Sequence, residues 1–200
     1  MDKEFDLVRK ILDGDQRKFE QIITLYERLV THIVFRMVSD DLDREEICQE
    51  VFIKVYQNLG GFQFKAKLST WIGKITYNMC INFIRKEKPA LYDDLYREDN
   101  QNNEQISFAE KTESLHSRIN QPDMLVEKSA RTELIRNMIE KLPVQYKIIL
   151  TMFHLDEFKY DEIAEITGIP EGTIKSHLFR ARKMLKENLI AEFEGEELWQ

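Results

Sequence analysis

Residues 160–186 read YDEIAEITGIPEGTIKSHLFRARKMLK, and this stretch predicts two helices joined by a tight turn. Asp161 can cap a short first helix, and Gly168 supplies the backbone freedom that ends it. Pro170 stands in the first turn of the second helix, where a missing backbone N–H is tolerated. The stretch therefore predicts a helix-turn-helix.

The second helix of this motif has one apolar and one cationic face. Its apolar residues recur at helical spacing and should face inward: Ile174, Leu178, Ala181 and Leu185. The same spacing leaves another set outside: Lys175, Ser176, Phe179, Arg180, Arg182 and Lys183. A DNA major groove admits such a helix, whose N-terminal half would meet base edges. The alternative is an ordinary helical hairpin with a solvated basic face. The turn chemistry, the apolar stripe and the outward cations together favour a helix that binds DNA.

The overall composition limits the class of protein. The chain has 200 residues, 32% of them charged, and only 7 Gly and 4 Pro, which favours one large or two small helical domains. The net charge of -7 argues against a protein that coats nucleic acid indiscriminately, so a local cluster of cations indicates a polyanion bound at one surface. The N-terminus lacks the apolar core of a signal peptide, and no run of about eighteen apolar residues occurs. We therefore expect a cytoplasmic protein without membrane insertion.

Residues that usually carry catalysis or bind metals are scattered. Cys48 and Cys80 have neither metal-site spacing nor the pattern of a disulfide framework, so we expect buried, reduced thiols. The histidines form no cluster, and the sequence shows neither a phosphate-binding glycine loop nor a nucleophile–base pair. We predict a protein that is not an enzyme and has no catalytic residue, metal or cofactor.

The N-terminal half also has helical periodicity. Apolar spacing predicts helices over residues 6–12, 16–38, 43–59 and about 70–88. We expect Asp43 to open the third helix, and Ser69 or Thr70 to cap the fourth. The buried stripe of the fourth is expected to be Ile72, Ile75, Met79 and Phe83. The outer face of the third is rich in acid and amide groups, and composition leaves open whether it is solvated or docks on a basic partner.

A basic and aromatic stretch leads into the fourth helix. Between Lys65 and Lys88, six cations face a single acid, and aromatic rings at Phe62, Phe64 and Trp71 lie among or beside them. Cations that follow a backbone, together with rings that stack on bases, suit single-stranded nucleic acid. The alternative is that these rings belong to the core.

Two stretches resemble one known family. The segment YDEIAEITGIPEGTIKSHLFRARKML, preceded by KLPVQYKIIL, is similar to region 4 of bacterial extracytoplasmic-function (ECF) sigma factors. The run DREEICQEVFIKVYQNLGGFQFKAKLSTWIGKITYNMCINFIRKEK resembles region 2 of the same family. The matches together cover residues 1–88 and about 130–190. Gly73, Thr76 and His177 depart from the residues that are frequent in the family.

The resemblance implies binding to core RNA polymerase, promoter recognition, DNA melting and transcription initiation. The residues implied in binding the clamp helices of the largest polymerase subunits, beta and beta′, are Asp43, Glu46, Gln49, Glu50 and Lys54. Those implied at the -10 motif are Phe62, Phe64, Lys65, Lys67, Trp71, Lys74, Asn78 and Arg85. Those implied at the -35 motif are Thr173, Lys175, Ser176, His177, Phe179, Arg180 and Lys183.

The expected fold is all-α, with two small helical domains joined by a flexible acidic linker. The expected segments are a region 2 bundle (1–89), a linker (90–123), a region 4 helix-turn-helix domain (124–190) and an acidic tail (191–200). The linker is either a spacer or, as the resemblance suggests, a segment that threads through the RNA-exit path of polymerase. The implied partners are core RNA polymerase, promoter DNA and an anti-sigma factor.

The alternative function is a conventional dimeric helix-turn-helix regulator that does not bind polymerase. Such a protein would need a dimer interface and palindromic sites. It would leave the basic aromatic stretch around Trp71 without a role.

Overall fold

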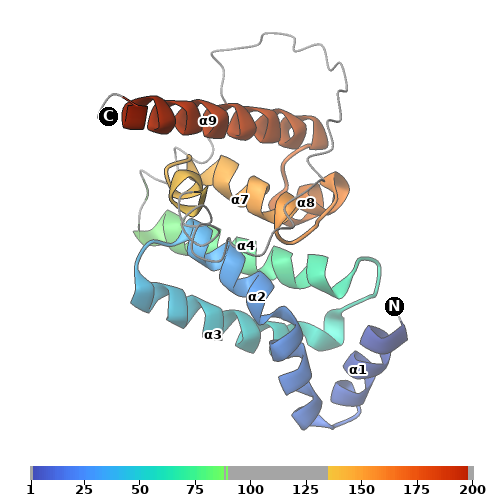
Figure 1. Cartoon of the computed structure of the whole chain (residues 1–200). Coiled ribbons are helices and arrows are strands. Elements are labelled where there is room, and N and C mark those ends of the chain that lie inside the picture. Colours follow the sequence, from blue (N-terminus) through green and yellow to red (C-terminus); the bar gives the residue numbers. More distant parts are fainter. Residues whose placement is uncertain (1, 88, 90–134, 198–200) are drawn as a thin grey trace, which may run out of the picture.

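The computed structural model describes residues 2–87, 89 and 135–197, and every regular element in these ranges is a helix (Figure 1). The first module contains α1 (Asp2–Leu12), η1 (Gln16–Lys18), α2 (Phe19–Met37), α3 (Asp41–Asn58), η2 (Leu59–Gly61) and α4 (Leu68–Glu87). The second contains α7 (Val144–His154), α8 (Tyr160–Thr167) and α9 (Glu171–Glu197), preceded by helical residues 135–140. The predicted all-α fold is confirmed.

The helices of the first module bury the apolar faces that their spacing predicts. In α2 the residues Ile22, Val30 and Ile33 are fully buried, and in α3 the same holds for Val51 and Val55. α4 packs on both of these helices. Because each such side chain contributes about 1.5–3 kcal/mol when buried, this apolar contact is the main source of the module's stability.

The second module is the predicted helix-turn-helix. Gly168 ends α8 with a φ of 75°, a left-handed conformation that glycine adopts without steric cost. In α9 the residues Ile174, Leu178 and Ala181 are buried against α7 and α8, whereas Leu185 is half-buried. α9 continues past the motif to Glu197, so part of the expected acidic tail is helical.

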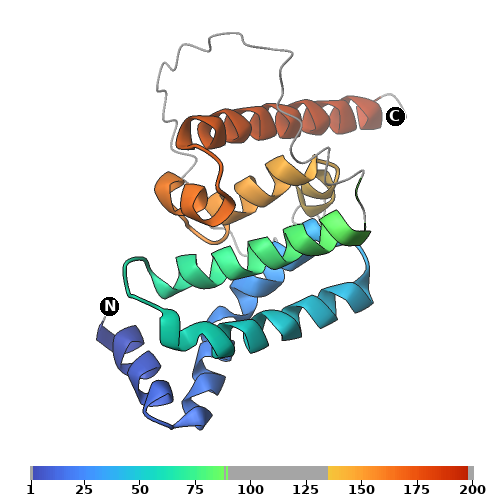
Figure 2. The ribbon, with the colours of Figure 1, turned by 180° about the vertical axis from the view of Figure 1, so that it is seen from behind.

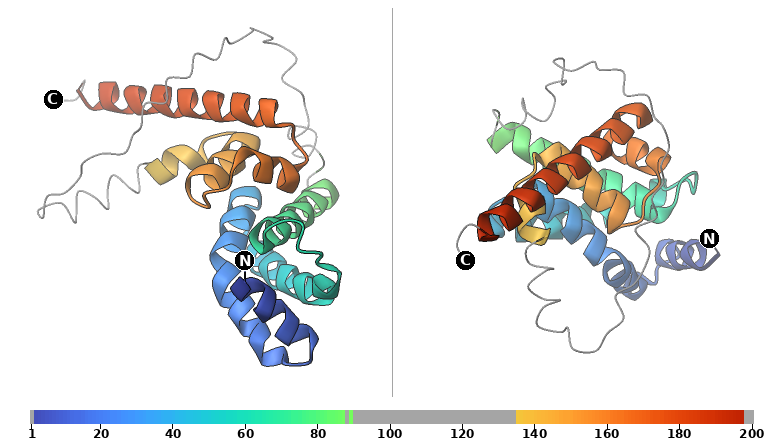
Figure 3. Two further views of the ribbon diagram at one scale, coloured as in Figure 1. Left: turned by 90° about the vertical axis from the view of Figure 1, so that its right-hand side faces the viewer. Right: turned by 45° about the horizontal axis from the view of Figure 1, so that its top comes forward.

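The two modules pack directly on one another (Figures 2 and 3). α8 lies on α4 and α7 lies on α2, and the buried side chains of both modules form one continuous apolar core. α9 lies on the opposite side of α7 and α8 from the first module, as the left view of Figure 3 shows. The layer formed by α7 and α8 therefore separates α9 from α4.

Two helix starts in the first module differ from the predicted ones. α3 begins at Asp41, because Asp40 and not Asp43 caps it. The Asp40 carboxylate accepts hydrogen bonds from the backbone N–H groups of Leu42 (2.9 Å) and Asp43 (3.2 Å). α4 begins at Leu68, so the predicted caps at residues 69 and 70 were wrong and lie inside its first turn.

The start of α8 also differs from the prediction. Asp161 lies within the first turn of the helix, where it was expected to be the cap. The backbone N–H of Lys159 instead donates to the Glu162 carboxylate at 2.9 Å. An acid in the first turn is still favourable, because it faces the positive end of the helix dipole.

The buried face of α4 is broader than the predicted stripe. Ile72 is buried as expected, but Ile75, Met79 and Phe83 are only half-buried. The buried residues of the helix are Leu68, Thr70, Ile72, Gly73, Thr76, Tyr77, Cys80, Ile81 and Ile84. The predicted stripe covers only part of this face, because α4 packs not only on α2 and α3 but also on α8.

Parts of the predicted organisation lie outside the described residues. These are the linker over residues 90–123 and the first part, residues 124–134, of the predicted region 4 domain. None of the helices that the structure describes is both long enough and apolar enough to cross a membrane.

Candidate DNA and polymerase interfaces

The first half of α9 presents a continuous outer surface. The predicted residues that lie exposed or half-buried along it are Thr173, Lys175, Ser176, Phe179, Arg180 and Lys183. The side chain of Phe179 is 45% exposed, so its ring is accessible on this surface. The Ser176 hydroxyl donates to the carbonyl oxygen of Gly172 at 3.0 Å, so its oxygen can still accept a further hydrogen bond.

His177 is placed differently from the other predicted -35 residues. Its ring is half-buried and meets the ring of Tyr146 edge-on, with centroids 5.2 Å apart. Tyr146 is a buried residue of α7. His177 therefore contributes to the packing of α9 on α7, which the sequence prediction missed.

Aromatic rings of α7 and α8 hold two cations of α9 in place. The rings of Phe153 and Tyr160 stack with centroids 5.0 Å apart and an interplanar angle of 9°. Lys175 lies 5.3 Å from the Tyr160 centroid and Arg182 lies 5.7 Å from that of Phe153. Cation–π contacts of this length are attractive. These contacts hold the charged groups of Lys175 and Arg182 in defined directions, which their flexible side chains alone would not do.

His154 completes this group of side chains at the end of α7. Its Nε2 atom lies 3.2 Å from Nη2 of Arg182, so the imidazole nitrogen accepts from the guanidinium. Burial lowers the pKa of His154, and the positive charge of Arg182 lowers it further. Sequence spacing gave no signal for this contact, because the two residues are 28 positions apart.

A row of aromatic rings lines the loop before α4. The centroids are 4.8 Å apart for Phe5 and Phe64, 4.6 Å for Phe64 and Phe62, and 5.1 Å for Phe62 and Trp71. Phe62 is buried, which favours the core alternative for that ring. Phe64 and Trp71 are half-buried and retain accessible surface. Phe64 also has a φ of 56°, a strained value for a bulky residue and one that is enriched at functional sites.

The predicted -10 polar residues divide between solvent and α8. Lys74, Asn78 and Arg85 are exposed and follow one another along one side of α4, and Lys65 is exposed in the loop. Lys67 instead pairs with Glu162 of α8, with Nζ and Oε1 2.9 Å apart. Hydrogen bonding to Glu162 raises the pKa of Lys67.

An open groove of about 950 Å³ lies between α3 and α4. Four of the five predicted polymerase-binding residues line it, namely Asp43, Glu46, Glu50 and Lys54. Gln49 is exposed on α3 but does not line the groove. The apolar lining comes from Ile47, Ile53, Met79 and Phe83. Because Ile53 is 56% exposed, the groove offers apolar surface to a partner as well as charge.

The cysteines and histidines form no metal site within the part of the chain that the structure describes. Cys48 and Cys80 are not joined by a disulfide. Cys80 is buried and Cys48 is half-buried, so the predicted burial is confirmed fully for Cys80 alone. Burial raises the pKa of both thiols, which keeps them protonated and unreactive at neutral pH.

Comparisons with known proteins find two matching families. Residues 22–90 match Sigma-70 region 2, and residues 132–185 match Sigma-70, region 4. The chain is 31% identical over 186 residues to the ECF RNA polymerase sigma factor SigW of Bacillus subtilis (strain 168), covering 91% of this chain and 94% of that protein. It is 27% identical over 190 residues to the RNA polymerase sigma-H factor of Pseudomonas aeruginosa, covering 94% of each.

The fold is also similar to that of a solved structure. The sigma factor RpoE from Bartonella quintana, crystallised in complex with the anti-sigma factor NepR, aligns with a TM-score of 0.60. The alignment covers 86% of this chain and 97% of that one, at 20% sequence identity. The likeness supports a shared fold that includes both helical modules.

Proposed function

Because the chain belongs to the family of ECF RNA polymerase sigma factors, we propose that its surface is divided into three interfaces. The chain is a sigma factor that binds core RNA polymerase and directs promoter recognition and transcription initiation. We assign the groove between α3 and α4 to polymerase, the loop before α4 with the outer side of α4 to the -10 motif, and α9 to the -35 motif. Sigma factors are not enzymes, so the chain contributes binding and positioning.

The groove carries the proposal for polymerase binding. Acidic side chains of α3 border it, and Ile53 of α3 and Met79 of α4 contribute apolar lining. An amphipathic helix with apolar and basic residues would fit such a groove, because apolar contact supplies affinity and opposite charge sets orientation. We therefore expect the clamp helices of the largest polymerase subunit to dock here.

The loop before α4 and the outer side of that helix support a role at the -10 motif. Trp71 and Phe64 offer ring surface for an unstacked base, while Lys74 and Arg85 can follow the phosphate backbone. Unpairing a base costs a few kcal/mol, and stacking on a ring returns about 1–3 kcal/mol per base. Melting would then be driven by capture of the exposed strand.

The outer surface of α9 supports a role at the -35 motif. Its first half carries hydroxyl, cationic and aromatic side chains, as a recognition helix in a major groove requires. Arg180 is suited to read a guanine edge, and Lys175 is held over Tyr160 where it can reach a phosphate. α9 is exposed along this surface even while the modules are packed together.

We also assign the protein to the cytoplasm, where polymerase and promoter DNA reside. An anti-sigma factor is a further expected partner. The support is the family resemblance together with the Bartonella quintana structure, in which a sigma factor of similar fold is bound to one.

Transcription reconstituted from purified core polymerase, this chain and a genomic promoter library tests the function. We expect start sites that depend on the chain and share a -35 and a -10 motif. If the chain neither associates with core polymerase nor confers start-site selection, the proposed function is wrong.

A pair of matched variants tests the groove. Glu50→Lys reverses a charge in the groove, and Glu45→Lys makes the same change at an exposed position of α3 outside it. We expect the first to weaken polymerase binding by about tenfold and the second to leave it unchanged. Equal effects would place the polymerase contact elsewhere.

A further inference from the structure

The first turn of α1 lies against the loop assigned to the -10 motif (Figures 1 and 2). This loop covers residues 62–67, between η2 and α4. The ring of Phe5 in α1 meets the ring of Phe64 with centroids 4.8 Å apart and an interplanar angle of 55°. Phe5 was not among the residues implied at this motif, because it lies far from the loop in the sequence.

The helix that carries Phe5 is held in place by its other side chains. Val8 and Ile11 of α1 are buried in the apolar core. The Tyr26 hydroxyl of α2 donates a hydrogen bond to Oε1 of Glu4 at 2.6 Å. Burial raises the pKa of Tyr26, and the Glu4 carboxylate raises it further, so the hydroxyl remains a donor at neutral pH. Phe5 therefore extends from a fixed support.

The other end of α1 contacts the segment that enters the loop. A Cβ atom at Gly60 in η2 would lie 3.8 Å from Cδ2 of Leu12, which is an ordinary van der Waals distance. The Leu12 side chain therefore lies beside the backbone of η2. α1 thus contacts both the loop and the residues immediately before it.

Phe64 has a backbone conformation that needs support from its neighbours. Its φ of 56° lies in a region that bulky residues rarely adopt. Such a conformation persists only where the surrounding structure holds it. The Phe64 ring contacts Phe62, with centroids 4.6 Å apart, as well as Phe5. Phe62 belongs to the same loop, whereas Phe5 comes from a separate and anchored helix.

We propose that Phe5 is a positioning residue for the -10 site, because its ring holds Phe64 in the conformation in which the loop receives an unstacked base. This role deepens the proposed function and rests on it. A loop that is already ordered loses less conformational freedom when the strand binds, so the strand binds more tightly. Phe5 acts on the DNA through Phe64.

Cleavage of the full chain by trypsin after Lys65 tests the order of the loop without DNA or polymerase. Lys65 is exposed in the loop, and cleavage there requires the loop to open locally. We expect Phe5→Ala to speed this cleavage by about fivefold, as the loop loses its outside support. Phe5→Tyr keeps the ring and should be cleaved at the wild-type rate. A wild-type rate for Phe5→Ala would overturn the proposal.

Two controls separate loop order from general stability. Leu25→Ala is the matched variant, because Leu25 of α2 is also apolar and is 61% exposed. It should be cleaved after Lys65 as slowly as the wild type. Cleavage after Lys54, within α3, should be the same in every variant. If Phe5→Ala speeds both cleavages equally, the ring only stabilises the module and the proposal is wrong.

A direct contact with DNA is the competing explanation, because Phe5 itself is 43% exposed. Binding of a -10 single strand, taken from a promoter that the reconstituted polymerase selects, is measured on the chain in complex with core polymerase. We expect Phe5→Ala to weaken binding by about fivefold, and Phe64→Ala by at least as much. The double variant should bind like Phe64→Ala alone, because no ring remains to be positioned. Losses that multiply in the double variant would overturn the positioning role.

Binding to a duplex that carries only the -35 motif completes the test. Phe5→Ala should bind this duplex and core polymerase as the wild type does, because α1 lies outside both of those assigned surfaces. A loss of all three activities would show damage to the whole module and overturn the proposal. If the wild-type complex does not bind the -10 strand, the proposed function fails, whereas cleavage after Lys65 still decides whether Phe5 orders the loop.

Discussion

The two helices assigned to DNA differ in how much of the molecule determines their surfaces. α9 packs on α7 and α8 within its own module and leaves its outer face exposed. α4 packs on helices of both modules, and Lys67 in the loop before it is paired with α8. The state of the -10 surface therefore depends on contacts between residues about 90 positions apart, whereas the -35 surface is a local property of the helix-turn-helix.

This difference separates variants that act within one module from variants that act on both. A change on α9 should affect DNA binding with little effect on the fold. A change near the start of α4 should affect stability, the packing of the two modules and DNA binding together. The following predictions are ordered from the largest expected effect to the smallest.

Trp71→Ala should have the largest effect, because it removes a half-buried ring that packs on Phe62. We expect a loss of about 3 kcal/mol in the free energy of unfolding, together with weaker promoter opening. Trp71→Phe should retain most of the stability. Thermal melts and a permanganate footprint measure the two effects, and an unchanged melting temperature for Trp71→Ala would contradict the packing described for this ring.

Arg180→Ala should weaken binding to the -35 motif by about 1–3 kcal/mol, the value of a specific side-chain contact with a base. Because the position lies on the outer part of α9, the melting temperature should change little. Fluorescence anisotropy with -35 duplexes of correct and altered sequence measures the discrimination. If the variant and the wild type discriminate equally between the two duplexes, Arg180 does not contact a base of the -35 motif.

Lys74→Ala should weaken binding to -10 single strands by the same factor whatever their sequence, because its expected partner is a phosphate. The slope of log affinity against log salt should fall by about 0.7 for one phosphate contact on a single strand. Lys10→Ala, an exposed lysine of α1, is the control and should leave the slope unchanged. A sequence-dependent loss for Lys74→Ala would instead indicate contact with a base.

Acid should weaken the second module slightly through His154. Its pKa is lowered in the folded state by burial and by Arg182, so the unfolded chain binds the proton more tightly. The resulting stability is present above the ordinary pKa of about 6.5 and is lost as the pH falls below it. Urea unfolding at pH 7.5 and 5.5 should show a smaller difference for His154→Gln than for wild type. An equal difference would show that another group is responsible.

Local sequence signals predicted the helix-turn-helix well. Gly168 ended α8 where expected, and the spacing of Ile174, Leu178 and Ala181 placed the outer face of α9 correctly. These features depend on residues within a few turns of each other. Helix caps were less accurate, because Asp40 and Asp43 are both suitable acids and the choice between them depends on where the preceding chain leaves α2.

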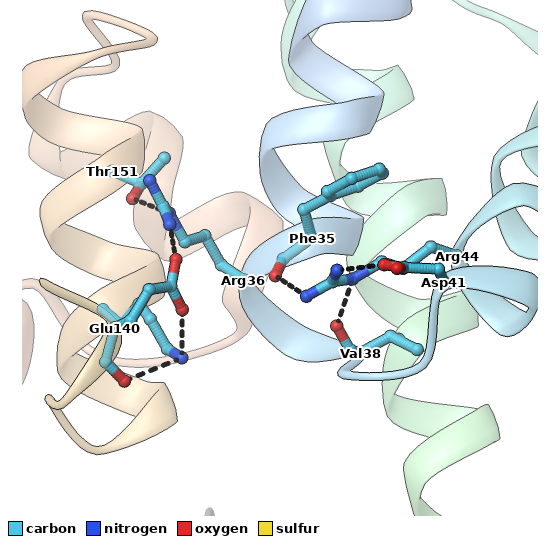
Figure 4. Close-up of polar contacts among 8 residues, drawn as sticks. Phe35, Arg36, Val38, Asp41, Arg44, Glu140 and Thr151 are labelled. Carbon is cyan, nitrogen blue, oxygen red and sulfur yellow. Dashed lines mark hydrogen bonds and ion pairs between the residues drawn. The ribbon is translucent and has the colours of Figure 1, made fainter. Parts of the chain in front are cut away.

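The contacts between modules were not predictable in the same way. Gly73 was recognised as a departure from the family, but its neighbour Ile166 is 93 positions away. The pairs of His32 with Asp156 and of Arg36 with Glu140 likewise join segments that only the tertiary fold brings together, as Figure 4 shows for the second pair. Periodicity predicts that a face is buried but not which helix covers it, and for this reason the stripe predicted for α4 was incomplete.

The most direct test measures the distance between α3 and α9 before and after addition of core polymerase and promoter DNA, with spin labels on cysteines introduced at the exposed positions Gln57 and Lys186. It shows whether the surfaces assigned to the -10 and -35 motifs lie farther apart in the promoter complex. We predict a single short distance in the isolated chain and its replacement by a long distance in the promoter complex. A short distance that persists in a transcriptionally active complex would contradict the account.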